Sequence, residues 1–393
     1  MATTGSGHRD NLRVLIACCL LSMVMGSIHG FSIYLDPLQQ ELKTTRSQTS
    51  FTYSAALLML TMGLLTGYRW FGSLRPLITM FLLVVIAATG LWVSTMAESV
   101  YLLWFGYSLV FALANGMSYG YALQFPAQVY PGNQGLVMGL VTALYAIGAA
   151  VTPLLVKSGL QYGGWRSGML VQALFLLSVL PMLVLLLSRN AVRFQIADRP
   201  VAGTRFLTGG ILPLWFGYGL TAMSGLMILG HAVAVIDNRL LNQSLVVFLP
   251  AVVALSSIPG SVLGGWLLDR FGPATMLYGL PVALFMVLTG LIFAVTLPAS
   301  LTALGLVGFL YGCTIVVYPA AIAHWYGARE GGSVYSRVFT AWGIAGLLGP
   351  WLAGTIYDIT LGYHWAFAVS ALVSLVALIP VRLMISNQSG FNR

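Results

Sequence analysis

The chain has 393 residues, of which 59% are hydrophobic and only 7% are charged, and its formal net charge is +9. A soluble domain would carry roughly 25% charged residues, so this chain has more apolar sequence than one soluble core could bury. The composition excludes an ordinary soluble globular fold and predicts a membrane protein whose solvent is the lipid bilayer. The three cysteines all lie in apolar runs, so neither a disulfide framework nor a metal site is predicted.

Twelve apolar segments are long enough to cross a hydrocarbon core of about 30 Å, which requires roughly 20 helical residues. Runs of this length do not alternate as barrel strands do, so each is predicted to be an α-helix. In chain order the predicted spans are 12–34, 50–68, 76–95, 100–124, 135–156, 168–188, 208–236, 244–268, 275–297, 300–323, 333–357 and 363–385. The first run is too long for the apolar region of a signal peptide, so it is predicted to be a spanning helix.

The distribution of basic residues predicts the orientation of these spans. An even number of spans places both termini on one side, and thirteen of the 18 basic residues lie there. The opposite side has only five, namely Lys43, Arg46, Lys157, Arg166 and Arg239. Basic loops stay in the cytoplasm, so both termini are predicted to be cytoplasmic, in a bacterial inner (plasma) membrane. The net charge then reflects topology and contact with lipid headgroups, and no nucleic-acid partner is expected.

The longest polar interval divides the chain into two halves of six spans each. It predicts an N-terminal six-helix bundle over 1–188, a cytoplasmic linker over 189–207 and a C-terminal six-helix bundle over 208–393. The second half repeats the first at offsets of 196 to 200, since Gly116 matches Gly312 and TALYAIGAAVTP matches TAWGIAGLLGP. Repeats of this kind indicate a duplicated unit and imply two bundles that rock around a shared central site.

The stretch GGWLLDRFGP between the eighth and ninth spans carries two adjacent charges, Asp269 and Arg270, in a chain that has few. Gly265 allows close helix contact, and Gly272 followed by proline predicts a sharp turn. Asp269 can lie near a helix N-terminus, where the helix dipole stabilises a negative charge and would favour one closed state. Arg337 begins the eleventh span and is interpreted as a loop charge or a gate residue. The alternative for the whole stretch is an ordinary charged loop.

These residues resemble the loop signature G-x-x-x-D-R-x-G of the major facilitator superfamily, at the position of its second-half copy. The first-half copy, GYRWFGSLRP, departs from the signature because Arg69 stands where the family has Asp. The fourth span also lacks the buried arginine that many proton-driven members carry. The resemblance implies an all-α membrane protein with 12 transmembrane helices in two pseudo-symmetric six-helix bundles, which transports by alternating access.

Three segments resemble the monocarboxylate and oxalate–formate transporter branch of that superfamily: 30–54, 225–235 and 339–358. The branch handles small organic anions, and its members often place a Lys or Arg on helix one, eight or eleven. Here the eighth span is uncharged, and Trp342 stands where oxalate exchangers carry a lysine. A singly charged or bulkier, partly apolar substrate is therefore expected, in preference to a dicarboxylate held by paired cations.

No Asp, Glu, Lys or Arg lies near a predicted midplane, so the candidate substrate-binding residues are uncharged. His29 is the best titratable candidate because an unperturbed imidazole titrates near about pH 6.5. The repeat pairs His231 with it, and Asn115 and Tyr119 share one face of the fourth span because they are four residues apart. The complete set is His29, Asn115, Tyr119, Tyr145, His231, Tyr318 and Trp342. For each of them, packing without ligand contact is the alternative.

The leading hypothesis is a secondary active transporter of a small monocarboxylate-type organic anion, working by proton symport or anion exchange. One alternative is efflux or uptake of a larger amphiphilic compound, such as a drug or siderophore. Another is a transporter-like sensor that binds without translocating. The expected partners are a small-molecule substrate, the lipid bilayer and, for symport, protons as the coupling ion. A monomer is expected, because the bundle contains its own central pathway. No cofactor, metal or catalytic residues are expected, because the sequence contains no phosphate loop and no activated nucleophile.

Overall fold

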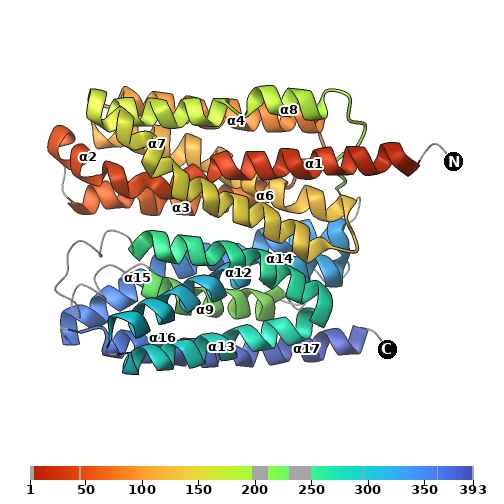
Figure 1. Cartoon of the computed structure of the whole chain (residues 1–393), viewed down its shortest axis with the longest axis vertical. Helices are drawn as coiled ribbons and strands as arrows, with labels where there is room; N and C mark the ends of the chain where they lie inside the picture. The colour runs from red at the N-terminus through yellow and green to blue at the C-terminus, as the bar shows by residue number, and fades with distance from the viewer. Residues whose placement is uncertain are drawn as a thin grey trace. The chain divides into compact units, whose positions relative to one another are not determined.

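The structure, a computed structural model, describes residues 4–43, 46–196, 211–229, 249–294, 296–360 and 362–391, and their regular secondary structure is helical (Figure 1). The helices are α1 (Thr4–Met25), η1 (Gly26–Tyr34), α2 (Leu35–Leu42), α3 (Arg46–Gly67), α4 (Pro76–Thr95), α5 (Val100–Leu103), η2 (Trp104–Phe111), α6 (Ala112–Val129), α7 (Gln134–Leu177), α8 (Leu180–Leu187), α9 (Ile211–Leu229), α12 (Leu249–Phe271), α13 (Pro273–Phe293), α14 (Leu297–Val338), α15 (Thr340–Thr360), α16 (His364–Val376) and α17 (Leu378–Phe391). Helices satisfy their own backbone groups, as lipid requires, and the predicted all-α membrane fold is confirmed.

Judged by length and composition, eight helices in the described part of the chain could each cross a membrane. They are His8–Phe31, Pro76–Thr95, Val100–Val129, Gln134–Leu187, Ile211–Leu229, Pro273–Phe293, Leu297–Gly327 and His364–Ile385. The fourth of these extends over the fifth and sixth predicted spans, and its backbone leaves the helical region between them at Gly163 and Gly164. The second predicted span is the slightly shorter apolar helix Phe51–Gly67, and the eighth and eleventh correspond to α12 and α15.

The chain divides into two compact units. The first comprises Met1–Pro131 and Leu144–Ala197, and the second comprises Gly132–Ala143 and Asp198–Arg393. The short segment Gly132–Ala143, which begins α7, thus belongs with the C-terminal half of the chain. The bundle and linker boundaries derived from the sequence stay predictions.

Glycines interrupt the long helices where one predicted span gives way to the next. Gly163 and Gly164 leave the helical region inside α7, and Gly327, with φ 74°, does so inside α14. Gly272 has φ 82° and lies between the end of α12 and Pro273, the first residue of α13. A residue with a Cβ is strained at such positive φ, so glycine makes the turn between the eighth and ninth spans possible.

The duplication is visible in how the helices cross within each unit. In the first unit α3 packs on α6, and a Cβ added at Gly116 would overlap the carbonyl oxygen of Leu60. In the second unit α12 packs on α14, and a Cβ at Gly312 would overlap the carbonyl oxygen of Ser257. Small residues allow backbones to approach closely in lipid. The glycine pair matched by the sequence repeat therefore makes the same kind of contact in both units.

The first and fourth spans are not regular α-helices along their whole length. The first continues beyond Met25 as the 3₁₀-helix η1, and the fourth contains the π-helix η2. Hydropathy predicts uninterrupted spans at both places, because it carries no information on the local winding of a helix. Segments of 3₁₀- and π-helix release backbone groups from the α pattern and are frequent at functional sites.

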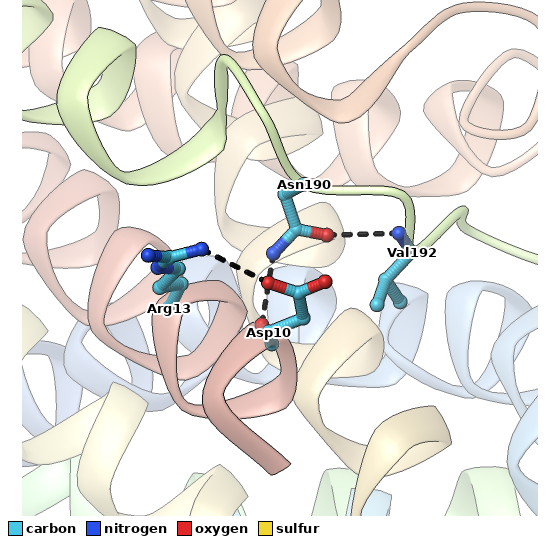
Figure 2. A network of polar contacts seen from close by, with 4 residues as sticks. All are labelled: Asp10, Arg13, Asn190 and Val192. Atoms are coloured by element: carbon cyan, nitrogen blue, oxygen red, sulfur yellow. Dashed lines mark hydrogen bonds and ion pairs between the residues drawn. The ribbon is translucent and has the colours of Figure 1, made fainter. Parts of the chain in front are cut away.

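The segment that follows α8 is fastened to the first unit. Asn190 donates from Nδ2 to the backbone oxygen of Asp10 at 2.9 Å and accepts from the N–H of Val192 at 2.8 Å, while Arg13 pairs with the Asp10 carboxylate at 3.0 Å (Figure 2). Gln195 then exchanges two hydrogen bonds with Gln128, each 3.0 Å long.

Phe194 lies between these polar attachments and is buried, with 4% of its surface exposed. Its ring contacts those of Tyr68, Phe71, Tyr121 and Phe125, with centroid separations of 5.1 to 6.1 Å. Tyr68 and Phe71 belong to the first-half loop GYRWFGSLRP, which departs from the charged signature. This loop therefore holds an aromatic residue of the predicted linker.

Candidate functional site

The polar candidates of the first unit gather around η1. The start of a 3₁₀ segment leaves backbone carbonyls without their α-helical partners, and such groups need other donors inside lipid. Three side chains supply them: Asn115 Nδ2 donates to the oxygen of Met25 at 2.6 Å, Gln172 Nε2 to Ser27 at 3.1 Å and Tyr107 OH to Ile28 at 3.0 Å. The irregular part of the first span is thus held in place by side chains of neighbouring helices.

His29 lies in the middle of η1 and is half-buried. Its Nδ1 is 2.6 Å from the hydroxyl of Tyr53 on α3. Its ring also meets the ring of Tyr145 edge-on, with centroids 5.5 Å apart and an interplanar angle of 79°. The imidazole is therefore oriented by two tyrosines from two different helices.

Asn115, Tyr119 and Tyr145 join the same cluster. Tyr145 OH donates to Asn115 Oδ1 at 3.1 Å, so the two ends of the Asn115 amide are used by Tyr145 and by the Met25 carbonyl. The rings of Tyr119 and Tyr145 are 4.9 Å apart. Four of the seven predicted substrate-binding residues are brought together in this unit, although their role in binding stays a prediction.

Sequence reasoning did not find Tyr53, Tyr34 or Gln172. Tyr34 OH donates to Gln172 Oε1 at 3.0 Å, and Gln172 in turn supports the backbone of η1. All three residues lie in apolar spans, where a buried glutamine or tyrosine is costly unless it has a partner. That cost was the available signal, but the partners come from other helices and cannot be identified from spacing along the chain.

In the second unit, Tyr318 and Trp342 each contact other side chains of the same unit. Tyr318 is fully buried on α14, and its hydroxyl is 3.2 Å from Thr221 Oγ1 on α9. Trp342 on α15 donates from Nε1 to the hydroxyl of Tyr311 at 2.9 Å and stacks on Phe339, with centroids 5.0 Å apart. Tyr311 was not predicted as a site residue. The remaining candidate, His231, lies outside the described residues.

The ion pairs formed by described residues involve no member of these clusters. The ion pair of Arg13 with Asp10 lies near the start of α1, and Arg166 pairs with Glu41 of α2. No group of three metal-ligating side chains is found among the described residues. The first-unit cluster offers hydrogen bonds and aromatic surface.

Asp269 lies at the end of α12 and contacts the first turn of α7 within the second unit. Its Oδ1 accepts from the N–H of Gly135 at 3.0 Å, and its Oδ2 accepts from the N–H of Leu136 at 2.8 Å. Gly265 allows this approach, because an added Cβ would overlap the carbonyl oxygen of Gly135. The free N–H groups and positive dipole end of a helix stabilise a carboxylate at this position.

The other residues of the predicted gating motif have separate environments. Arg270 is exposed, and its guanidinium lies over the rings of Trp266 and Phe271 at 5.4 and 5.9 Å. Gly272 makes the turn described above. Arg337 is half-buried in the last turn of α14, and Thr340 Oγ1 donates to its backbone oxygen at 2.7 Å. A role of these residues in gating stays a prediction.

Comparison with known proteins places these features in a family context. The model of the Major Facilitator Superfamily matches residues 15–314 and, in a second match, residues 200–389. The chain is 22% identical over 372 residues to the uncharacterized MFS-type transporter YhjX of Escherichia coli (strain K12). This alignment covers 88% of each of the two proteins. It is 23% identical over 384 residues to the oxalate:formate antiporter of Oxalobacter formigenes. This alignment covers 93% of this chain and 88% of the antiporter.

A solved structure shares the fold at low sequence identity. The crystal structure of the transporter FucP in the outward conformation superposes with a TM-score of 0.72 over 95% of this chain and 99% of FucP, at 14% identity. Identity at this level supports the shared architecture and says nothing about the substrate.

Proposed function

This chain belongs to the Major Facilitator Superfamily of secondary transporters, and we propose that it moves a small monocarboxylate-type organic anion across the membrane by alternating access. Members of the family are transporters and not enzymes, and this one is an integral, multi-pass membrane protein. We further propose that both termini are cytoplasmic, that the membrane is a bacterial inner membrane, and that the two six-helix bundles are joined by a linker over 189–207.

The observation that carries the proposal is the uncharged polar cluster around η1. His29, Tyr53, Asn115 and Tyr145 combine two hydrogen bonds with aromatic surface. A site of this kind suits a ligand with one polar end and a small apolar body, because apolar pockets with a few polar groups fix orientation through those groups. The likeness to an oxalate:formate antiporter supports an organic anion, and Trp342 argues against paired cations for a dicarboxylate.

Proton symport and anion exchange are both compatible with this cluster. His29 is the titratable residue within it whose unperturbed pKa is close to neutral pH, so it is the proposed proton carrier if transport is proton-coupled. In an exchanger, a second substrate anion would return in place of the proton, and no titrating residue would be required.

A larger amphiphilic substrate is the second candidate function. The aromatic contacts favour it: Tyr119 packs on Tyr145, Phe31 on Tyr53, and Trp342 on Phe339. Aromatic rings provide extensive apolar surface for a bulky ligand. In this case the apolar surface would supply most of the affinity, and the hydrogen bonds of His29 would supply little.

Purified protein in proteoliposomes separates these candidates. Formate, acetate, lactate, pyruvate and oxalate are first screened for thermal stabilisation, and those that bind are tested for uptake with and without a pH gradient and for exchange against internal substrate. We expect a monocarboxylate to stabilise the protein and to be transported, and Tyr145→Phe to weaken both effects. Tyr278→Phe is the control, because Tyr278 is an exposed residue of the second unit.

The possible outcomes lead to different conclusions. Stabilisation and uptake of an amphiphilic compound, with no effect of any carboxylate, would replace the first candidate by the second. Stabilisation by a carboxylate without uptake or exchange in either direction would indicate a sensor that binds without translocating.

A further inference from the structure

The contact between His29 and Tyr53 carries a more specific inference, which rests on the proposed function. We infer that Tyr53 is a positioning residue: its hydroxyl donates to Nδ1 of His29 and holds the imidazole as the Nε2–H tautomer. The neutral ring then presents one N–H donor to a carboxylate oxygen of the substrate. The hydrogen-bond partners of the two side chains decide between the tautomers.

Two arrangements of hydrogen are possible in the 2.6 Å contact. If Tyr53 donates, its only hydroxyl hydrogen is used, and the proton of the neutral imidazole resides on Nε2. If Nδ1–H donates instead, the hydroxyl hydrogen of Tyr53 needs another acceptor. Tyr53 makes no second hydrogen bond with the part of the chain that the structure describes. In the first arrangement the Nε2–H of His29 is the donor without a described partner, and in the second arrangement it is the hydroxyl of Tyr53. The first arrangement is preferred because a phenol hydroxyl is a stronger donor than an imidazole N–H, and an imidazole nitrogen is a stronger acceptor than a phenol oxygen.

Packing keeps both rings in this geometry. The Tyr53 ring stacks on Phe31, which is buried, with centroids 5.9 Å apart and an interplanar angle of 7°. The His29 ring meets the Tyr145 ring edge-on at 5.5 Å. The direction of Nε2 is therefore set by residues of η1, α3 and α7, and little ordering is needed when a ligand binds.

The other ring nitrogen is available to a ligand. His29 is half-buried, and the contacts of its ring with described residues are those to Tyr53 and Tyr145. Neither of these contacts includes a hydrogen bond to Nε2. An Nε2–H group can only donate, so it selects an acceptor such as a carboxylate or carbonyl oxygen.

The surroundings of His29 also limit the charge that the ligand can carry. The titratable groups that face it are the hydroxyls of Tyr53 from α3 and Tyr145 from α7, both neutral near pH 7. A hydrogen bond between a neutral donor and a carboxylate is charge-assisted and stronger than one between neutral groups. One such donor accommodates one carboxylate, and no charged group among the described residues contacts His29 to hold a second one.

The test is a direct measurement of the tautomer. The full-length protein is labelled with ¹⁵N-histidine, and the His29 resonances are assigned by their loss in His29→Gln. We expect the ligand-free wild-type protein to contain His29 as the Nε2–H tautomer, Tyr53→Phe to contain a mixture of both tautomers, and Tyr278→Phe to be unchanged. A wild-type Nδ1–H tautomer, or a tautomer that Tyr53→Phe leaves unaltered, would overturn the inference.

A binding measurement tests the second half of the inference. Tyr53→Phe is expected to weaken binding of the monocarboxylate found in the screen by about five- to tenfold, with a thermal stability in its absence close to that of wild type. An equally large loss for an uncharged amphiphilic ligand would assign the effect to packing and overturn the donor role. The tautomer is measured without ligand, so complete absence of carboxylate binding refutes the proposed function separately from the positioning role of Tyr53.

Discussion

At the scale of single residues, several polar groups within the apolar spans have specific partners on other helices. Asn115 is fully buried and uses its amide twice, toward Met25 and toward Tyr145. An unpaired amide at this depth would be costly, so such residues persist only where the neighbouring helices supply partners. The cluster around His29 therefore stabilises the fold of the first unit and is at the same time the proposed substrate site.

His29→Gln tests whether this histidine couples transport to protons. Glutamine can still form hydrogen bonds but has no titrating group, so accumulation driven by a pH gradient should be lost. Exchange should be retained, because it requires no net proton movement. Both activities are measured in proteoliposomes, with His8→Gln as the control at an exposed position. Wild-type accumulation by His29→Gln would show that the coupling proton is carried elsewhere or with the substrate.

Tyr145→Phe tests the hydrogen bond to Asn115. Removing the hydroxyl leaves the buried Oδ1 of Asn115 without the Tyr145 donor, and a lost buried hydrogen bond of this type costs about 1–2 kcal/mol. We expect a lower midpoint of thermal unfolding in detergent together with weaker substrate binding. If unfolding and binding both match wild type, the 3.1 Å contact contributes nothing to either property.

At the scale of helices, the end of α12 and the first-half loop each have specific partners. The carboxylate of Asp269 lies against the first backbone N–H groups of α7, and Gly265 provides the space. The first-half counterpart has Arg69 in place of aspartate, and its loop holds Phe194 of the linker instead. The two repeats thus use the same loop position for different contacts.

Asp269→Asn should change the balance between inward- and outward-open states. The amide can accept one hydrogen bond but lacks the negative charge, and the interaction of an exposed charge with a helix dipole is worth less than about 1 kcal/mol. A shift of a few fold in the accessibility of cytoplasmic-side cysteines, at nearly normal expression, is therefore expected. Glu98→Gln neutralises another exposed carboxylate as the control. Unchanged accessibility and transport would identify Asp269 as an ordinary loop charge.

Phe194→Ala tests the attachment of the linker to the first unit. Truncating a buried phenylalanine typically costs about 3–5 kcal/mol, and the contacts with four aromatic rings would be lost here. We expect a clear decrease in thermal stability and faster proteolysis after α8. Phe105→Ala is the matched control because Phe105 is half exposed. Equal stability of the two variants would contradict a structural role for this contact.

At the scale of the whole molecule, the duplicated sequence produces two units with equivalent helix crossings. Gly116 and Gly312 permit the same backbone approach in α3–α6 and α12–α14. The described helices follow the order predicted from the spans, and the family match extends over most of the chain. Orientation in the membrane is a separate property and depends on the basic residues in the loops.

Cysteine labelling tests the proposed orientation. In a background without the three native cysteines, Lys43→Cys and Gln195→Cys place single thiols at exposed positions. In intact cells, an impermeant reagent should label position 43, while position 195 should require a permeant one. Lysed cells, in which both positions should react, are the control. The reverse pattern would refute the assignment of both termini to the cytoplasm.

The sequence by itself determined the all-α membrane fold and the family, and it predicted the spans and the duplication. These follow from hydropathy, glycine placement and the charged loop around Asp269, all of which are local properties of the chain. It also identified four residues that belong to one cluster, because polar side chains in apolar spans are rare enough to stand out.

Only the tertiary structure decided which of these residues meet and through which partners. Tyr53 beside His29 and Tyr311 beside Trp342 come from separate helices, and their pairing depends on helix rotation and register. Hydropathy does not specify these quantities, because lipid is as apolar as the helices and does not drive one particular face into contact. The change from α1 to η1 at Gly26 has the same origin, since the donors that stabilise it belong to other helices.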